Sequence, residues 1–174
     1  MFILFVGNMA PRKNLPGVLA AFGLLRSQDR DLHLVLAGAA PSASAAKAAR
    51  AGTSVHWPGY VEPGDLPALY ALAEALVFPS FDEGFGLPAL EAMACGCPVV
   101  CSPGGAADVC GDAALVCDPA SPASIAAAVQ ALLSNPALRC AKVEAGQRRA
   151  AQFRWDHTVQ ELEALYCDVS MAWR

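Results

Sequence analysis

The chain has 174 residues, of which 55% are hydrophobic and 16% charged, and its formal net charge is −4. This composition is too apolar for a disordered chain and too poor in charge for a coiled coil, and the length is typical of one domain. The negative charge argues against a nucleic-acid-binding protein that relies on bulk electrostatics, so an anionic ligand would have to be bound by local donors.

Seven cysteines, an odd number, lie mostly among apolar or small residues. None has the C-x-x-C spacing of zinc sites, since Cys95 and Cys97 are separated by a single glycine. We therefore expect buried free thiols in a reducing cytoplasm. The apolar run 1–6 lacks a basic leader and is too short for a signal peptide, and no apolar run is long enough to span a membrane. The sequence predicts a cytoplasmic domain.

Short apolar runs alternate with amphipathic stretches along the chain. Strands are predicted at 2–7, 32–38, 55–60, 75–79, 98–102 and 114–118. Apolar residues at helical spacing predict helices within 15–25, 66–73 and 125–133, then a break at Asn135-Pro136 and a last helix from about Trp155. The low-complexity segment 39–51 is expected to form a surface loop with a short helix.

Nearly continuous apolar strands that alternate with helices indicate a parallel sheet covered on both faces. The predicted fold class is therefore α/β, a doubly wound Rossmann-like parallel sheet of about six strands. Because the chain begins directly on a strand, it looks like a protein divided at a domain boundary. Ligands of such sheets bind outside the carboxyl ends of the strands, so the loops that follow the strands are the expected place for a site.

The first of these loops, 7–14, carries Arg12 and Lys13 directly before Asn14, a good N-cap for the next helix. Two cations at this position oppose the helix macrodipole, and a bound anion would relieve that conflict. A solvated basic turn is the alternative reading, and position alone does not decide between the two.

The loop after the fourth strand, 80–86, leads into a helix that has Pro88 in its first turn. No Ser, Thr, Asp or Asn stands at the expected cap, so the early backbone N–H groups are left for another partner. Gly84 and Gly86 would let backbone approach a ligand closely. Glu83 projects from the loop and Glu91 lies about one turn inside the helix, so the two carboxylates are expected to reach two parts of one extended ligand. A dipole partner for the helix is the alternative role of Glu91.

The spacing Gly84-x-Gly86-x-x-Ala89 formally matches the dinucleotide-binding fingerprint. Residues 80–83 separate the strand from the first glycine, and the charges of Asp82 and Glu83 would repel a pyrophosphate. The fingerprint also belongs to the first strand of such folds, whereas this is the fourth. We therefore reject this interpretation.

Several segments together carry a resemblance to a known family. The most specific is Glu-Gly-Phe-Gly-Leu-Pro at 83–88 with Glu-Ala-Met-Ala-Cys-Gly at 91–96, in which Glu83 and Glu91 have E-x7-E spacing. The other matching segments are 6–15, 59–61 with 65–66, 78–80, 98–100 and 111–113. In this order they resemble the C-terminal, donor-binding domain of the GT-B glycosyltransferases of family 4, also called glycosyl transferases group 1, over almost the whole chain.

The resemblance implies a transferase that uses a nucleotide-diphosphate sugar, retains the anomeric configuration and needs neither a bound metal nor a cofactor. Arg12 and Lys13 would hold the diphosphate and offset charge on the departing nucleotide. Glu91 would bind the ribose hydroxyls, and Glu83 the sugar hydroxyls together with backbone N–H groups near Phe85. The implied catalytic residues are Glu83, Arg12 and Lys13. The implied donor-binding residues are Gly7, Asn8, Arg12, Lys13, Tyr60, Val61, Glu83, Gly84, Phe85, Gly86, Leu87 and Glu91, with Gly7 beside the phosphates and acceptor and the backbone of Tyr60 and Val61 in the base pocket.

Two positions depart from the family pattern. Many relatives carry Arg where this chain has Asn8, and Arg12 is expected to take over part of that work. Asp108 stands where the family usually has a glutamate, and no role is assigned to it.

The resemblance also defines the expected partners. Residues 1–174 would be a single donor-binding domain, and the N-terminal acceptor domain of such enzymes is absent from this chain. Alone, the chain should bind a nucleotide sugar but transfer little or nothing. Nucleic acid is not an expected partner, and peripheral membrane contact would come through the missing half.

The leading hypothesis is thus the donor domain of a bacterial hexosyltransferase of the cell envelope, acting on a polysaccharide or lipid-linked acceptor. The Pro-Arg-Lys-Asn form of the first loop favours GDP-mannose, with UDP- and dTDP-sugars as alternatives. A non-catalytic nucleotide-sugar-binding subunit, or a sugar-nucleotide epimerase or phosphorylase of the same fold, are the alternative functions.

Overall fold

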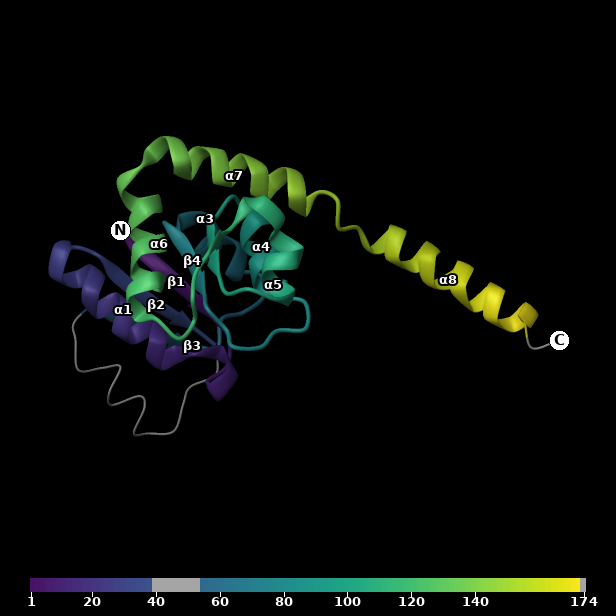
Figure 1. Cartoon of the computed structure of the whole chain (residues 1–174), viewed down its shortest axis with the longest axis horizontal. Helices are drawn as coiled ribbons and strands as arrows, with labels where there is room; N and C mark the ends of the chain where they lie inside the picture. The colour runs from purple at the N-terminus through teal and green to yellow at the C-terminus, as the bar shows by residue number, and fades with distance from the viewer. Residues whose placement is uncertain (39–53, 173–174) are drawn as a thin grey trace.

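The computed structural model describes residues 1–38 and 54–172, which contain a six-stranded parallel sheet in the order β3-β2-β1-β4-β5-β6 (Figure 1). The strands are β1 (Phe2–Val6), β2 (His33–Ala37), β3 (Val55–Gly59), β4 (Ala75–Phe78), β5 (Val99–Cys101) and β6 (Leu115–Val116). Each lies inside its predicted range, so the six predicted strands and the fold class are confirmed. The predicted loop and helix at 39–51 lie outside the described residues.

Helices cover both faces of the sheet. One face packs against α1 (Leu15–Gln28) and α6 (Pro122–Ser134). The other face packs against α3 (Leu66–Leu72), α4 (Leu87–Ala94), α5 (Gly105–Cys110) and α7 (Pro136–Ala150). The central strand β1 shows why two cores form, since Ile3 and Phe5 enter the first and Leu4 enters the second.

The helix break predicted at Asn135-Pro136 separates α6 from α7. The side chain of Asn135 accepts a hydrogen bond from the backbone N–H of Leu138 (3.0 Å), which caps the start of α7. Helices α5 and α7 and the short 3₁₀ helices η1 (Pro11–Lys13) and η2 (Gly111–Ala113) were not among the predicted elements.

The last predicted helix is confirmed as α8 (Trp155–Ala172). Figure 1 shows it extending away from the sheet and its covering helices, and residues 155–170 are all exposed. Within the ranges that the structure describes, no helix combines the length and apolarity needed to cross a membrane.

All seven cysteines are free thiols, as predicted. Cys97, Cys101, Cys110 and Cys117 are buried and Cys95 is half-buried, whereas Cys140 and Cys167 are exposed on α7 and α8. The expectation of burial is therefore wrong for the last two: Cys140 lies on an exposed part of α7, and α8, which carries Cys167, is exposed along residues 155–170.

Candidate anion-binding site at the switch point of the sheet

The sheet order places a topological switch point between β1 and β4. From β1 the chain moves outward to β2 and β3, then returns to the other side of β1 with β4 and continues to β5 and β6. Ligands of doubly wound sheets bind in the crevice outside the strand ends at such a point. The loops that follow β1 and β4, residues 7–14 and 79–86, are those that carry the predicted site residues.

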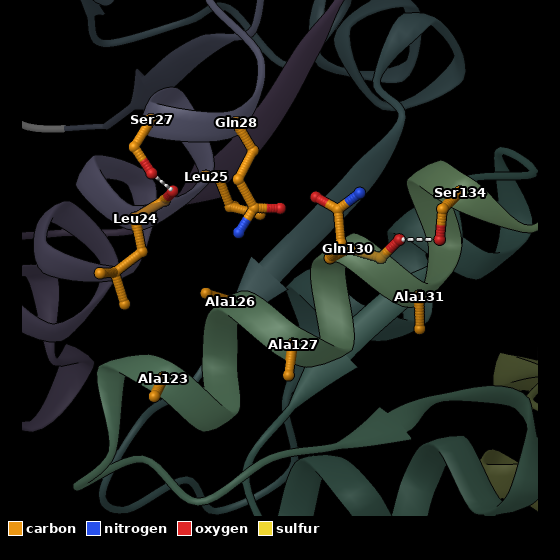
Figure 2. Close-up of a pocket in the computed structure, with 10 residues that line it drawn as sticks. All are labelled: Leu24, Leu25, Ser27, Gln28, Ala123, Ala126, Ala127, Gln130, Ala131 and Ser134. Atoms are coloured by element: carbon orange, nitrogen blue, oxygen red, sulfur yellow. Dashed lines mark hydrogen bonds between the residues drawn. The ribbon is translucent and has the colours of Figure 1, made fainter.

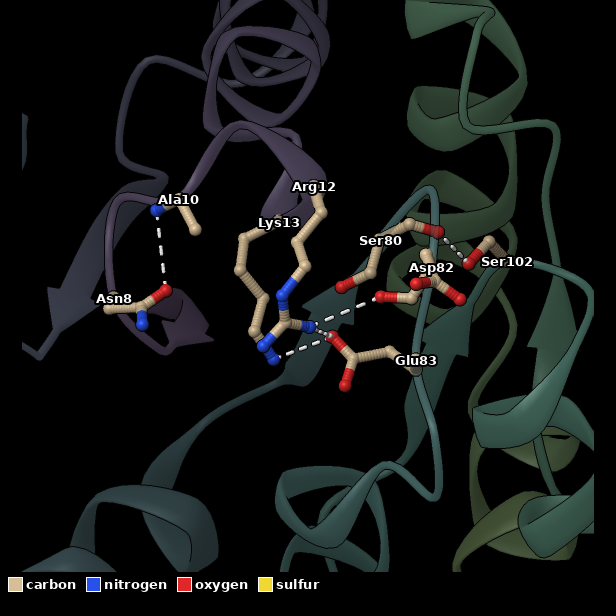
Figure 3. A network of polar contacts seen from close by, with 8 residues as sticks. All are labelled: Asn8, Ala10, Arg12, Lys13, Ser80, Asp82, Glu83 and Ser102. Atoms are coloured by element: carbon tan, nitrogen blue, oxygen red, sulfur yellow. Dashed lines mark hydrogen bonds and ion pairs between the residues drawn. The ribbon is translucent and has the colours of Figure 1, made fainter.

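Three of these residues meet at one carboxylate oxygen. Glu83 Oε1 lies 2.6 Å from Lys13 Nζ and 3.1 Å from Arg12 Nη1, and Arg12 Nη1 also donates to the carbonyl of Asp82 (3.2 Å). Figure 3 shows the two cations reaching from the first loop to Glu83 on the second. The side chains of Lys13 and Glu83 are only 9% and 10% exposed, while that of Arg12 is 48% exposed. The alternative interpretation of the first loop as a solvated basic turn is therefore wrong for Lys13, because Lys13 has a buried anionic partner.

Asn14 fixes the backbone that presents the two cations. It lies in the left-handed region (φ 56°), and its side-chain oxygen accepts from the N–H of Gly17 (3.2 Å), so it is the N-cap that the sequence predicted. Its side-chain nitrogen donates to the carbonyls of Pro79 (3.1 Å) and Pro119 (2.7 Å). One asparagine thus holds the end of η1, the start of α1 and the end of β4 together.

Lys13 is held by packing as well as by charge. Its Nζ lies 4.4 Å from the centre of the Phe78 ring, in a cation–π contact at the end of β4. A Cβ added to Gly7 would lie 3.6 Å from Lys13 Cε, so the stem of the lysine runs beside the end of β1. The ammonium group is therefore already in place at the switch point without a ligand.

The two glycines of the second loop differ in their surroundings, and the close approach to a ligand predicted for them stays a prediction. A Cβ at Gly86 would lie 2.8 Å from the Cβ of Ala106, so this position is small because α5 packs against it. Gly86 also has φ 88°, which favours glycine. Gly84 alone has open space around its Cα. The start of α4 has no side-chain cap, as the sequence predicted.

Glu91 lies on α4 and does not share the contacts of Glu83. Its Oε2 accepts a hydrogen bond from the hydroxyl of Tyr70 on α3 (2.9 Å). Burial, and then the nearby carboxylate, raise the pKa of Tyr70 far above its ordinary value, so the phenol stays a donor. From the sequence, Tyr70 was assigned only to the apolar face of the helix predicted within 66–73. The signal that was missed is that a tyrosine on a buried stripe needs a partner for its hydroxyl.

The remaining predicted residues lie around this cluster without an ion pair to it. The side chain of Asn8 accepts from the N–H of Ala10 (3.2 Å) within its own loop. Tyr60 is 70% exposed after β3, and Val61 packs against the second core. Phe85 and Leu87 are exposed, and the Phe85 ring meets Phe153 edge to face. The side chain of Asp108 is exposed, and the hydrogen bonds of this residue are made by its backbone: the carbonyl accepts from Arg149 (3.2 Å) and the N–H donates to the carbonyl of Gly104 (2.9 Å).

Two further features bear on what the site could bind. Among residues 1–38 and 54–172, no group of three or more His, Cys, Asp or Glu could hold a metal ion. Figure 2 shows a groove of about 530 Å³ between α1 and α6, lined by alanines, leucines, serines and glutamines with no charged side chain. The groove has no charged side chain to attract an anion, whereas the cluster at the switch point has two cations.

Comparison with known proteins identifies the family of this chain. The family described as glycosyl transferases group 1 matches residues 1–149. An O-antigen chain mannosyltransferase B of Escherichia coli is 41% identical over 94% of this chain and 45% of its own length. The chain thus spans about half the length of the curated relatives it matches.

Solved structures place the fold among the same enzymes. Sucrose-phosphate synthase of Thermosynechococcus elongatus has a TM-score of 0.84 at 28% identity, over 98% of this chain and 46% of that one. The C-terminal domain of a group 1 glycosyl transferase (LpcC) of Francisella tularensis has a TM-score of 0.76 at 25% identity, over 87% of this chain and 84% of that one. The sheet is the doubly wound half of a GT-B fold, and the chain belongs to the glycosyl transferases group 1 family.

Proposed function

We propose that this chain is the donor-binding half of a retaining glycosyltransferase that moves a hexose from a nucleotide-diphosphate sugar to a polysaccharide or lipid-linked acceptor. The observation that carries the proposal is the convergence of Lys13 and Arg12 on one carboxylate oxygen at the switch point. Two cations within hydrogen-bond distance of one oxygen form a site for an anion with several oxygens, such as a diphosphate.

The chemistry follows from that charge. When the bond between the sugar and the diphosphate breaks, negative charge grows on the departing nucleotide, and Lys13 and Arg12 stabilise it from fixed positions. Because these two side chains supply the positive charge, we propose that transfer needs no divalent metal and no cofactor.

Glu83 has two successive partners in this proposal. In the structure its carboxylate lies against the cations. When a diphosphate takes that place, the carboxylate is free to accept hydrogen bonds from the sugar hydroxyls, together with the N–H groups near Phe85. Glu91 binds the ribose with the oxygen that Tyr70 does not occupy. Retention of configuration is proposed from the E-x7-E spacing of Glu83 and Glu91, which the family resemblance links to retaining enzymes.

We propose GDP-mannose as the donor. The first loop has the form Pro-Arg-Lys-Asn, and the relative at 41% identity is named a mannosyltransferase of the O-antigen chain. That name also supports a cell-envelope acceptor. The seven free thiols support a reducing compartment, which we propose to be the cytoplasm. Since the chain spans about half of its relatives, we propose that a second domain supplies the acceptor side and that this chain alone binds donor without transferring sugar.

Calorimetric titration of the chain with GDP, UDP, dTDP and ADP in the presence of EDTA tests the proposal. We expect GDP to bind, and to bind more tightly than the other three. Tight binding of UDP or dTDP instead would move the donor to another nucleotide while keeping the site. If none of the four bound, the assignment of this cluster as a donor site in the isolated chain would fail.

A further inference from the structure

Ser80 lies in the loop after β4, separated from the end of the strand at Phe78 by Pro79. The residue is 1% exposed, and its hydroxyl is buried. Within the described ranges that hydroxyl is among the few buried side-chain polar atoms without a hydrogen-bond partner. Burying a hydroxyl unpaired costs free energy, so such a group in a native site needs an explanation.

The surroundings of Ser80 are the walls of the anion site. Apart from Ser80, each residue from 78 to 83 contacts the loop that carries the two cations. These contacts are the Phe78 ring with Lys13 Nζ (4.4 Å), the Pro79 carbonyl with Asn14 Nδ2 (3.1 Å), the Phe81 N–H with the Arg12 carbonyl (2.7 Å), the Asp82 carbonyl with Arg12 Nη1 (3.2 Å), and Glu83 with both cations. Ser80 is the member of this segment whose side chain is left without a partner.

The direction of the side chain agrees with its position. In Figure 3 the hydroxyl of Ser80 points from the end of β4 toward the side of Arg12 and Lys13, away from Ser102. The backbone carbonyl of Ser80 faces the opposite way and accepts a hydrogen bond from the hydroxyl of Ser102. Ser80 is therefore anchored through its backbone, while its O–H donor remains available on the side of the cations.

We propose that Ser80 is a further donor-binding residue, whose hydroxyl donates a hydrogen bond to a phosphate oxygen of the nucleoside diphosphate held by Lys13 and Arg12. This inference rests on the proposed function. A phosphate that replaces the Glu83 carboxylate at the cations brings additional acceptor oxygens to the place that this hydroxyl faces. The hydrogen bond to the anion would then offset the free energy that the unpaired hydroxyl costs.

Ser80→Ala tests the inference, with the nucleoside diphosphate that the wild-type chain binds and inorganic pyrophosphate as probes. A hydrogen bond to a charged group predicts an increase in Kd of about tenfold or more for both probes. The melting temperature of the free chain should not fall, because no internal hydrogen bond is removed. Ser102→Ala is the matched control: it removes a buried hydrogen bond, so its melting temperature should fall.

Two results would overturn the assignment of Ser80. One is that Ser80→Ala binds both probes as tightly as the wild-type chain does. The other is a fall in melting temperature like that of Ser102→Ala, which would mean that the hydroxyl has a structural partner. Failure of the proposed function looks different, because then the wild-type chain itself binds neither probe or Lys13→Ala binds them as tightly as the wild type.

Discussion

Lys13 and Glu83 form an ion pair that is almost fully desolvated. A buried pair recovers its desolvation cost only when the geometry is good and other contacts help. Here Arg12 shares the carboxylate oxygen, and the Phe78 ring lies against the ammonium group. The cluster thus contains its own anion, and under the proposed function a diphosphate would compete with Glu83 for the same two cations.

This competition leads to a prediction about Glu83→Gln. The amide is neutral and leaves Lys13 and Arg12 without an anion, so the affinity for a free nucleoside diphosphate should increase, by roughly 1.5–3 kcal/mol, the range for a hydrogen bond to a charged group. Lys13→Ala should do the opposite and weaken binding by about 1–3 kcal/mol. Calorimetry on the three proteins measures both effects. Weaker binding by Glu83→Gln would show that the carboxylate does not compete with the ligand.

Glu91 is predicted to affect a different part of the ligand. If its free oxygen binds the ribose, Glu91→Ala should weaken binding of a nucleoside diphosphate and leave binding of inorganic pyrophosphate unchanged. Tyr70→Phe should reproduce part of the first effect, because it removes the hydrogen bond that orients the carboxylate. The comparison of the two probes by calorimetry is the measurement. Binding of the nucleoside diphosphate at wild-type strength would show that the ribose assignment of Glu91 is wrong.

The sequence predicted part of this chemistry for a physical reason. Two cations before a helix N-terminus are an electrostatic conflict, and that conflict can be recognised within a few residues of chain. Their partner Glu83 lies 71 residues from Arg12, and Tyr70 lies 21 residues from Glu91. Pairs of this kind are fixed by which strands and helices become neighbours, and no local pattern contains that information.

At the scale of elements, the strands were predictable and two helices were not. A strand covered on both faces is a nearly continuous apolar run, which is a strong signal. Helix α7 has five charged residues among its fifteen, and only Gly146 and Ala150 are buried, so it has no apolar stripe to recognise. Helix α5 begins with glycine and has six residues, fewer than two turns. Both helices form because the sheet and α4 are there to pack against.

The start of α5 positions the loop of Glu83. A Cβ at Gly105 would overlap the carbonyl oxygen of Glu83 and lie 2.7 Å from that of Gly84, both of which are backbone atoms that cannot rotate away. The close approach of α5 to this loop therefore requires glycine at this position.

Gly105→Ala should accordingly destabilise the chain by about 1–3 kcal/mol, the usual cost of overpacking. Because the displaced loop carries Glu83, the carboxylate should also compete less well for Lys13 and Arg12, so a nucleoside diphosphate should bind more tightly than to the wild type. Gly23→Ala is the matched control on the exposed side of α1, where a Cβ meets nothing within 4 Å, and it should stabilise by about 0.5–1 kcal/mol. Urea denaturation and calorimetry measure the two effects. Wild-type stability in Gly105→Ala would mean that the loop has room to move.

At the scale of the whole molecule, several weak acids are buried in the two cores. Burial raises the pKa of Cys97 from its ordinary value of 9.0 to about 12, and burial followed by the charge of Asp118 raises that of Cys117 to about 11. Burial also raises the pKa of Tyr70. These groups lie in the core on both faces of the sheet, so their protonation is linked to the folding of the entire domain.

The sign of the linkage predicts loss of stability in alkali. Between pH 9 and 11 the unfolded chain releases thiol protons that the folded chain keeps, so the free energy of unfolding should decrease as pH rises. The slope is roughly 1.4 kcal/mol per pH unit for each buried thiol that only the unfolded chain ionises. Urea denaturation at pH 7, 8, 9, 10 and 11 should give a plateau below pH 9 and a decline above it. Cys97→Ala should start from a lower plateau, because it leaves a small cavity, but decline less steeply. Parallel curves for the two proteins would show that Cys97 does not contribute to the alkaline transition.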